Sequence, residues 1–170
     1  MKGVKYYTSW REWRKIEYNE TLPRPSCEDH THTGFGRYAN GDPDNKVMDF
    51  DYVRACCIPE MLDTLTRPFP FESMCCRNIE LNCHYWKMFL EAIAESDHRF
   101  VRVDLAHSNL TAREVPFLIA AFGNESLQSM DVACNIIDAI GVEMLREGVC
   151  RYGASLNAAS QNIGVGIVDK

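Results

Sequence analysis

The sequence predicts an α/β fold: a short solenoid of strand–helix repeats with a parallel sheet and an irregular helical N-terminal cap. Two segments, VDLAHSNLTAREV (103–115) and MDVACNIIDAIGV (130–142), place Leu110 and Ile137 27 residues apart. A shorter copy, NAASQNIGVGIV (157–168), places Ile163 another 26 residues on. Short apolar/polar alternation followed by a 3.6-residue apolar period indicates a strand and then a helix. A 20–29-residue period of this kind is the leucine-rich-repeat signature. An ordinary layered α/β fold with a parallel sheet is the alternative.

The N-terminal segment, residues 1–46, shows no repeat. Ser9 and Glu12 have the spacing of a capping box, which predicts a helix from about Trp10 to Asn19. Residues 26–45 are polar and rich in turn formers, and they predict a long loop. We expect this segment to cap or anchor the repeats.

Residues 47–170 are expected to form four to five degenerate repeats. VMDFDYV (47–53) predicts a first strand, and PEMLDTLT (59–66) predicts a short helix with Pro59 in its first turn. IELNCHYW (79–86) is interpreted as a degenerate strand copy, with Leu81 24 residues before Leu105.

The later units are clearer. Alternation over 101–106 places Val103 and Leu105 inward and Arg102 and Asp104 outward. Helical spacing predicts three helices, whose apolar residues are Trp86, Phe89, Leu90 and Ile93, then Val115, Leu118, Ile119 and Phe122, then Val142, Leu145 and Val149. Asn135 stands where an amide side chain would bridge the backbones of neighbouring units.

Composition restricts the function. The chain has 170 residues with 18 basic and 24 acidic side chains, a net charge of −6, so it carries no global footprint for nucleic acid. No apolar run is long enough for a transmembrane helix, and the N-terminus lacks the apolar region of a secretory signal. The eight cysteines, two pairs of them adjacent, fit free thiols better than a disulfide framework.

Part of the sequence resembles a known family. Trp13–Pro23, with Val4-Lys5-Tyr6 before it, is similar to the V-R-Y and W-x-K-x-Y-N-x-L-P stretches of ATP synthase coupling factor B. Val47–Asp51, Cys57-Ile58 and Ile79–Tyr85 resemble that family's later strand, its Cys-Ile pair and its I-R-L-x-x-C-H-Y motif in the same order. The resemblance covers residues 4–86.

This resemblance implies a non-catalytic leucine-rich-repeat protein peripheral to the matrix side of the mitochondrial inner membrane. The implied partners are subunits of ATP synthase, or of complex I for a related assembly branch, and no cofactor is implied. The sequence departs from the family by an insertion around 24–45. It also has Leu81-Asn82-Cys83 where the family has C-x-C, so dithiol chemistry is not expected.

The outward strand residues are the first candidate site. We expect five acids against one base on this face, which would dock a basic partner segment. The alternative is a solvated polar face. The candidate residues are Asp49, Asp51, Glu80, Arg102, Asp104 and Asp131, with Asn78, Asn82 and Ser129 beside them.

The N-terminal helix supplies a second candidate interface, because aromatic and arginine side chains are enriched at interfaces. Its residues are Trp10, Arg11, Trp13, Arg14 and Tyr18. The same tryptophans would also serve to pack a cap onto the first repeat. Cys27, His30 and His32 are weak zinc candidates, since zinc needs four ligands and no second pair has a matching spacing.

No nucleophile–base motif or phosphate-binding loop stands out, so we do not expect an enzyme. Two alternatives remain besides the mitochondrial accessory subunit. Ile58–Leu65 loosely resembles the start of an F-box, which would make the chain a cytosolic adaptor. The Cys27–His32 cluster would make it a zinc-binding protein.

Overall fold

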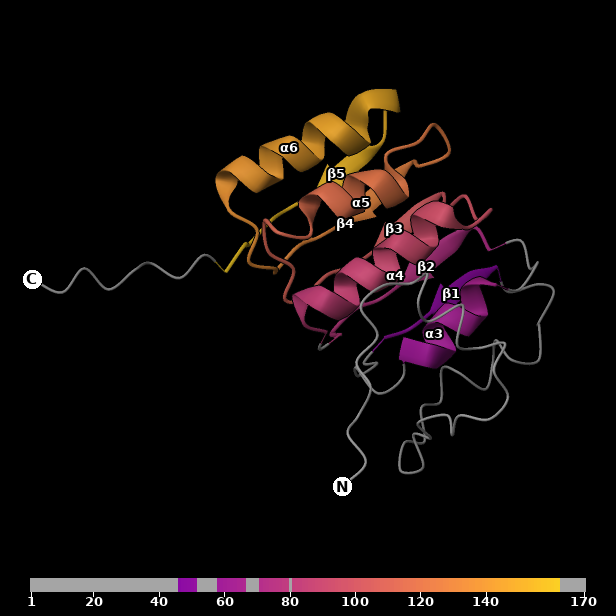
Figure 1. Ribbon diagram of the computed structural model, residues 1–170. Coiled ribbons are helices and arrows are strands. Elements are labelled where there is room, and N and C mark those ends of the chain that lie inside the picture. The colour runs from indigo at the N-terminus through magenta and orange to yellow at the C-terminus, as the bar shows by residue number, and fades with distance from the viewer. Residues whose placement is uncertain (1–45, 52–57, 67–70, 80, 163–170) are drawn as a thin grey trace, which may run out of the picture.

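A computed structural model describes residues 46–51, 58–66, 71–79 and 81–162 of the chain. The expected helix at Trp10–Asn19, the loop at 26–45 and the Ile163 anchor lie outside the described residues. Strands and helices alternate through the described part (Figure 1). The order is β1 (Val47–Asp49), α3 (Ile58–Leu65), β2 (Ser73–Cys75), α4 (Cys83–Glu95), β3 (Arg102–Asp104), α5 (Val115–Phe122), β4 (Ser129–Asp131), α6 (Ala139–Val149), the 3₁₀ turn η2 (Cys150–Tyr152) and β5 (Ser155–Asn157).

The five strands form one parallel sheet in the order β1-β2-β3-β4-β5. Neighbours in the sheet are therefore neighbours in the sequence. The strands begin at Val47, Ser73, Arg102, Ser129 and Ser155, which lie 26, 29, 27 and 26 residues apart. The predicted α/β class, with its strand–helix alternation and parallel sheet, is confirmed.

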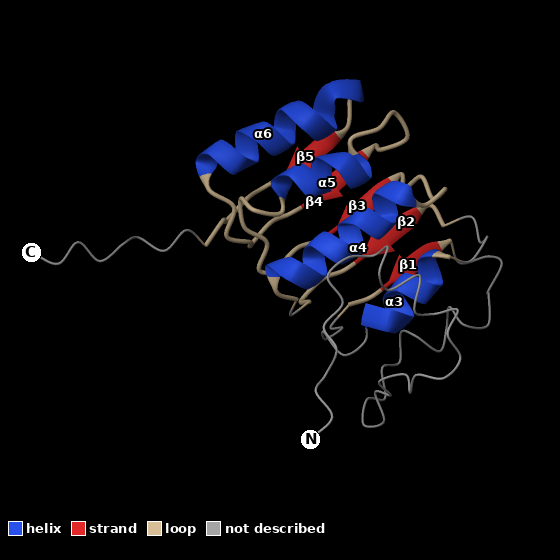
Figure 2. Cartoon of the chain, viewed as in Figure 1, coloured by secondary structure: helices blue, strands red, loops and turns tan. Residues whose placement is uncertain are grey.

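All four helices lie on one face of the sheet, side by side in chain order (Figure 2). The core lies between the helix layer and the sheet. The middle residue of each of the first four strands points into it, because side chains alternate along a strand. These residues are Met48, Met74, Val103 and Met130, all at most 3% exposed.

The predicted helical faces are confirmed. Trp86, Phe89, Leu90 and Ile93 are buried in α4, and Trp86 Nε1 donates a hydrogen bond of 3.3 Å to the carbonyl of Ser108. In α5 and α6 the predicted residues Val115, Leu118, Phe122, Leu145 and Val149 are buried, while Ile119 and Val142 pack at the margin of the core.

Polar side chains fix the starts of the helices. Asn82 Oδ1 accepts the backbone N–H of Tyr85 at the start of α4, and Asp138 Oδ1 accepts that of Gly141 at the start of α6. Before α5, the buried Glu114 accepts both the backbone N–H and the hydroxyl of Thr111, at 2.8 and 2.7 Å. Each contact satisfies a donor that a helix start would otherwise leave unpaired.

The interpretation of IELNCHYW as a strand is wrong. The second strand is Ser73–Cys75, and Ile79 and Leu81 are buried in the turn that leads into α4. Leu81 stands 29 residues before Leu110, the same offset that pairs Cys75 with Asp104, so it corresponds to Leu110 and not to Leu105. Alternating Ile79 and Leu81 imitate a strand, whereas Ser73–Cys75 has no β-branched or aromatic residue to mark one.

Candidate protein-interaction face

The face of the sheet opposite the helices carries two rows of side chains, one from each end of the strands. The first row, which we name the N-terminal row, is Val47, Ser73, Arg102, Ser129 and Ser155. The second, the C-terminal row, is Asp49, Cys75, Asp104, Asp131 and Asn157. Val47 and the residues of β2, β3, β4 and β5 line a shallow hollow of about 560 Å³ on this face.

Local hydrogen bonds orient most of the C-terminal row. Asp49, Asp104 and Asp131 each accept the backbone N–H two residues further on, at 3.0, 3.1 and 2.8 Å. Asn157 repeats the contact with Ala159 at 3.2 Å. The strand therefore ends at the same point in four units because the side chain replaces the next ladder partner.

The second unit departs from this pattern, since Cys75 occupies the aspartate position. Asp51 supplies the missing acceptor from the neighbouring unit: its Oδ1 accepts the backbone N–H of Arg77 at 2.7 Å. Its Oδ2 accepts Nε and an Nη of the same arginine at 2.9 and 2.6 Å. Arg77 Nε also lies 3.7 Å from Asp104 Oδ2. The hydrogen bonds and charge of Asp51 raise the pKa of the Arg77 guanidinium.

This arrangement corrects the predicted charge of the face. The described residues place four acids, Asp49, Asp51, Asp104 and Asp131, beside two bases, Arg77 and Arg102. Asn78 and Asn82 follow β2 and belong to neither row. Glu80 lies outside the described residues. The face is thus less acidic than five acids against one base, because Arg77 neutralises Asp51.

Arg77 is the residue that sequence reasoning missed. Its role depends on Ser73–Cys75 being a strand, since only that register sets Arg77 beside Asp51 and Asp104. The available signal was spacing: Arg77 stands 26 residues after Asp51, the separation of β1 and β2.

An amide ladder supports the turns that follow the strands. Asn135 Oδ1 accepts the backbone N–H groups of Ser108 and Leu110 at 2.9 and 3.0 Å. Its Nδ2 donates to the carbonyls of Leu105 and Val132 at 2.9 and 2.8 Å. In the next unit Gln161 binds the Val132 carbonyl and the Ile137 N–H in the same way. The prediction for Asn135 is confirmed: its side chain joins two units.

The turns themselves repeat a left-handed residue. Asn78, His107, Cys134 and Ser160 have φ values of 54°, 56°, 57° and 55° and occupy the same place in successive units. Identical backbone turns keep the strand ends level, so the C-terminal row presents its side chains along one line.

Cys75 lies within the carboxylates but is a poor nucleophile. Burial, with the negative charges of Asp51, Asp104 and Asp49, raises its pKa to about 11. Burial also raises the pKa of the adjacent Cys76 well above its ordinary value. At neutral pH both side chains are thiols, and the thiol is neither a nucleophile nor a metal ligand.

The other candidate residues lie outside the described residues: Trp10, Arg11, Trp13, Arg14 and Tyr18, and the zinc candidates Cys27, His30 and His32. Within the described ranges, no three His, Cys, Asp or Glu side chains are grouped so that they would hold a metal ion.

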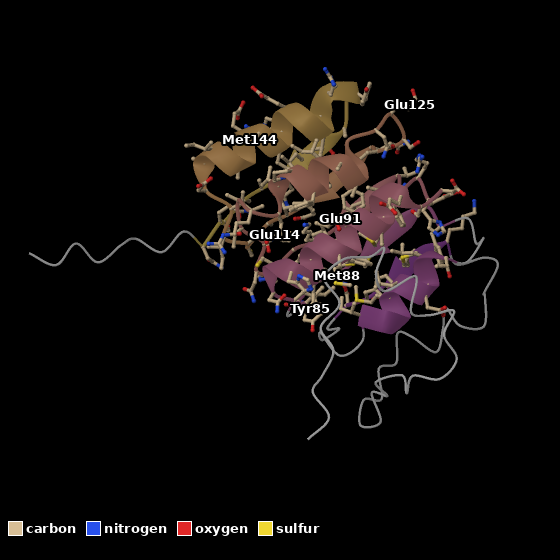
Figure 3. All side chains as sticks on the ribbon, viewed as in Figure 1. Tyr85, Met88, Glu91, Glu114, Glu125 and Met144 are labelled. Carbon is tan, nitrogen blue, oxygen red and sulfur yellow. The ribbon has the colours of Figure 1, made fainter. Side chains whose placement is uncertain are left out.

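The outer surface of the helix layer carries exposed apolar side chains on its last unit. Figure 3 shows Tyr85 and Glu91 on α4 and Met144 on α6. Ile136, Ile140 and Met144 lie four residues apart in and before α6, with Ile140 74% exposed.

No family model matches the chain, and a search of curated protein sequences gives no significant match. None of the helices in the described part of the chain combines the length and apolarity that crossing a bilayer requires.

Proposed function

We propose that this protein is a non-catalytic leucine-rich-repeat subunit, accessory or regulatory, of a mitochondrial inner-membrane complex, with ATP synthase as the first candidate. It acts by protein–protein interaction and is peripheral to the matrix side of the membrane. The observation that carries the proposal is the open face of a five-strand sheet whose helices all lie on the opposite side. Repeat arrays bind partners through extended surfaces of this kind.

Two further observations support the leucine-rich-repeat assignment. The units are 26 to 29 residues long, and Asn135 bridges them as the asparagine of that repeat does. The choice of complex rests on the resemblance to ATP synthase coupling factor B over residues 4–86. The F-box alternative has no observation in its favour, since α3 stands between β1 and β2 as the helix of one unit.

Affinity purification of the tagged full chain from mitochondria, followed by mass spectrometry, tests the proposal. We expect ATP synthase subunits, or complex I subunits for the assembly branch. Recovery of a cullin with its F-box-binding adaptor would overturn it.

The variant Asp104→Lys/Asp131→Lys tests whether the strand face is used, and we expect it to lose the complex. Glu125→Lys/Glu147→Lys is the matched control, because it makes the same change in net charge at exposed positions away from that face. Loss of the complex in both variants would indicate a general charge effect and count against the face.

A further inference from the structure

The two rows of the strand face carry opposite charges. Arg102 is the one charged side chain of the N-terminal row, with Ser73 and Ser129 on its two sides in the register. It is exposed and forms no ion pair among the described residues. Its guanidinium is therefore available to an external carboxylate.

The C-terminal row is negative at its centre. Asp104 and Asp131 are direct neighbours on β3 and β4, and adjacent strands lie about 4.8 Å apart. Arg77 is committed to Asp51 through three hydrogen bonds and reaches Asp104 only at 3.7 Å. Asn157 donates to Asp131 without neutralising it. A carboxylate accepts about four hydrogen bonds, so both retain acceptor capacity.

The dimensions of the face suit a short extended peptide. Arg102 and Asp104 are two residues apart on one strand, a separation of about 6.6 Å between the rows. β2 to β5 span three strand spacings, or about 14 Å, which equals four to five extended residues. Successive side chains of an extended peptide point to opposite sides, so a segment crossing the strands turns alternate residues toward alternate rows.

We propose that the partner contributes an extended segment that crosses the strands with a basic–acidic–basic triplet: the outer basic residues contact Asp104 and Asp131, and the central acidic residue contacts Arg102. This inference rests on the proposed function only in that the protein acts by binding other proteins. The outer residues of such a triplet are about 6.6 Å apart, against about 4.8 Å between the aspartates, and long basic side chains close that difference.

Fluorescence anisotropy with the full chain and three labelled heptapeptides tests the proposal. The probe is Gly-Ser-Arg-Glu-Arg-Ser-Gly. An isomer with the order Arg-Arg-Glu has the same composition and net charge, and a peptide with Glu-Arg-Glu inverts every charge. We expect the probe to bind at least tenfold more tightly than the isomer and the inverted peptide to show no binding, with an affinity that falls as salt rises.

Charge reversal on the protein gives the converse test. Arg102→Glu and Asp131→Lys should each weaken probe binding at least threefold, while Glu147→Lys should leave it unchanged. The triple variant Arg102→Glu/Asp104→Arg/Asp131→Arg should prefer the inverted peptide. Circular dichroism checks folding, and Arg102→Ala and Asp131→Asn replace any reversal that unfolds the chain.

Equal binding of the probe and its isomer, or binding that is indifferent to Arg102, would overturn the triplet. The two proposals fail separately. Peptide binding without capture of a mitochondrial complex rejects the proposed function, and capture that survives the Arg102 and Asp131 variants rejects the triplet.

Discussion

The side-chain oxygen of Asn135 lies 2.9 Å from the backbone nitrogen of Ser108, 27 residues earlier in the chain. Both residues are fully buried. Because the same amide also binds Leu110, Leu105 and Val132, one side chain holds four backbone groups of two units.

Replacing Asn135 with alanine should therefore lower the free energy of unfolding by about 2–4 kcal/mol, since several buried backbone groups lose their partners. Urea unfolding followed by circular dichroism measures the change. Asn157→Ala is the control, because Asn157 is exposed and its side chain donates to Asp131 at the surface. Equal losses in the two variants would contradict the bridging role.

The contact between Glu114 and Thr111 offers a second test. Glu114→Ala should destabilise the protein by about 1–3 kcal/mol, because the Thr111 N–H and hydroxyl lose their acceptor. Thr111→Ser keeps both donors and should change thermal unfolding much less. A neutral Glu114→Ala would show that this start of α5 does not depend on the contact.

The packing of α5 on α6 depends on glycine. A Cβ at Gly148 would lie 2.6 to 2.8 Å from three side-chain atoms of Ile119. Gly148→Ala should cost about 1–3 kcal/mol through overpacking. Ile119→Ala in the same chain removes the obstructing atoms, so a double-mutant cycle should show the two losses to be less than additive. Strict additivity would mean that the helices separate elsewhere.

His98 makes stability depend on pH. Burial lowers the pKa of His98 below its ordinary 6.5, although the Leu65 carbonyl, 3.0 Å from Nε2, opposes the shift. The unfolded chain then takes up a proton that the folded protein resists. The contribution of His98 is complete above pH 6.5 and is lost as the pH falls below it.

We therefore expect the midpoint of urea unfolding to fall between about pH 7.5 and 5.5. His98→Gln keeps a donor for Leu65 without a titrating ring, and its midpoint should fall less over the same range. Parallel curves for the two proteins would assign the dependence to other groups.

Cys75 should react slowly with iodoacetamide at pH 8. A pKa of about 11 leaves about a thousandth of the thiol ionised at that pH. The exposed Cys83 is the internal comparison and should be labelled first in a mass-spectrometric time course. Asp104→Asn removes one of the charges that raise the Cys75 pKa, so it should accelerate labelling of Cys75 but not of Cys83.

Most of the array follows from its sequence pattern. The strands around Val103 and Met130, the three longer helices and the place of Asn135 all repeat at about 27 residues, and the side-chain period alone predicts which of them are buried. The second unit does not follow, because the two-residue-longer spacing and a strand of Ser73, Met74 and Cys75 hide its register.

The chemistry of the strand face follows only in part. Asp104, Asp131 and Arg102 are predicted correctly as outward residues of the rows. The ion pair of Asp51 with Arg77 is not, because it joins residues 26 positions apart through a register that the sequence disguises. Charge patterns within one strand are readable, whereas compensation between strands needs the pairing itself.

The sheet order has a mechanical consequence. Because every strand pairs only with its neighbours in sequence, a pulling force applied at residues 46 and 162 loads the units in series and separates one strand pair at a time. Each separation breaks few hydrogen bonds, since the strands are three residues long. The array is therefore a compliant element along its stacking axis, extending in steps near the length of one 26–29-residue unit.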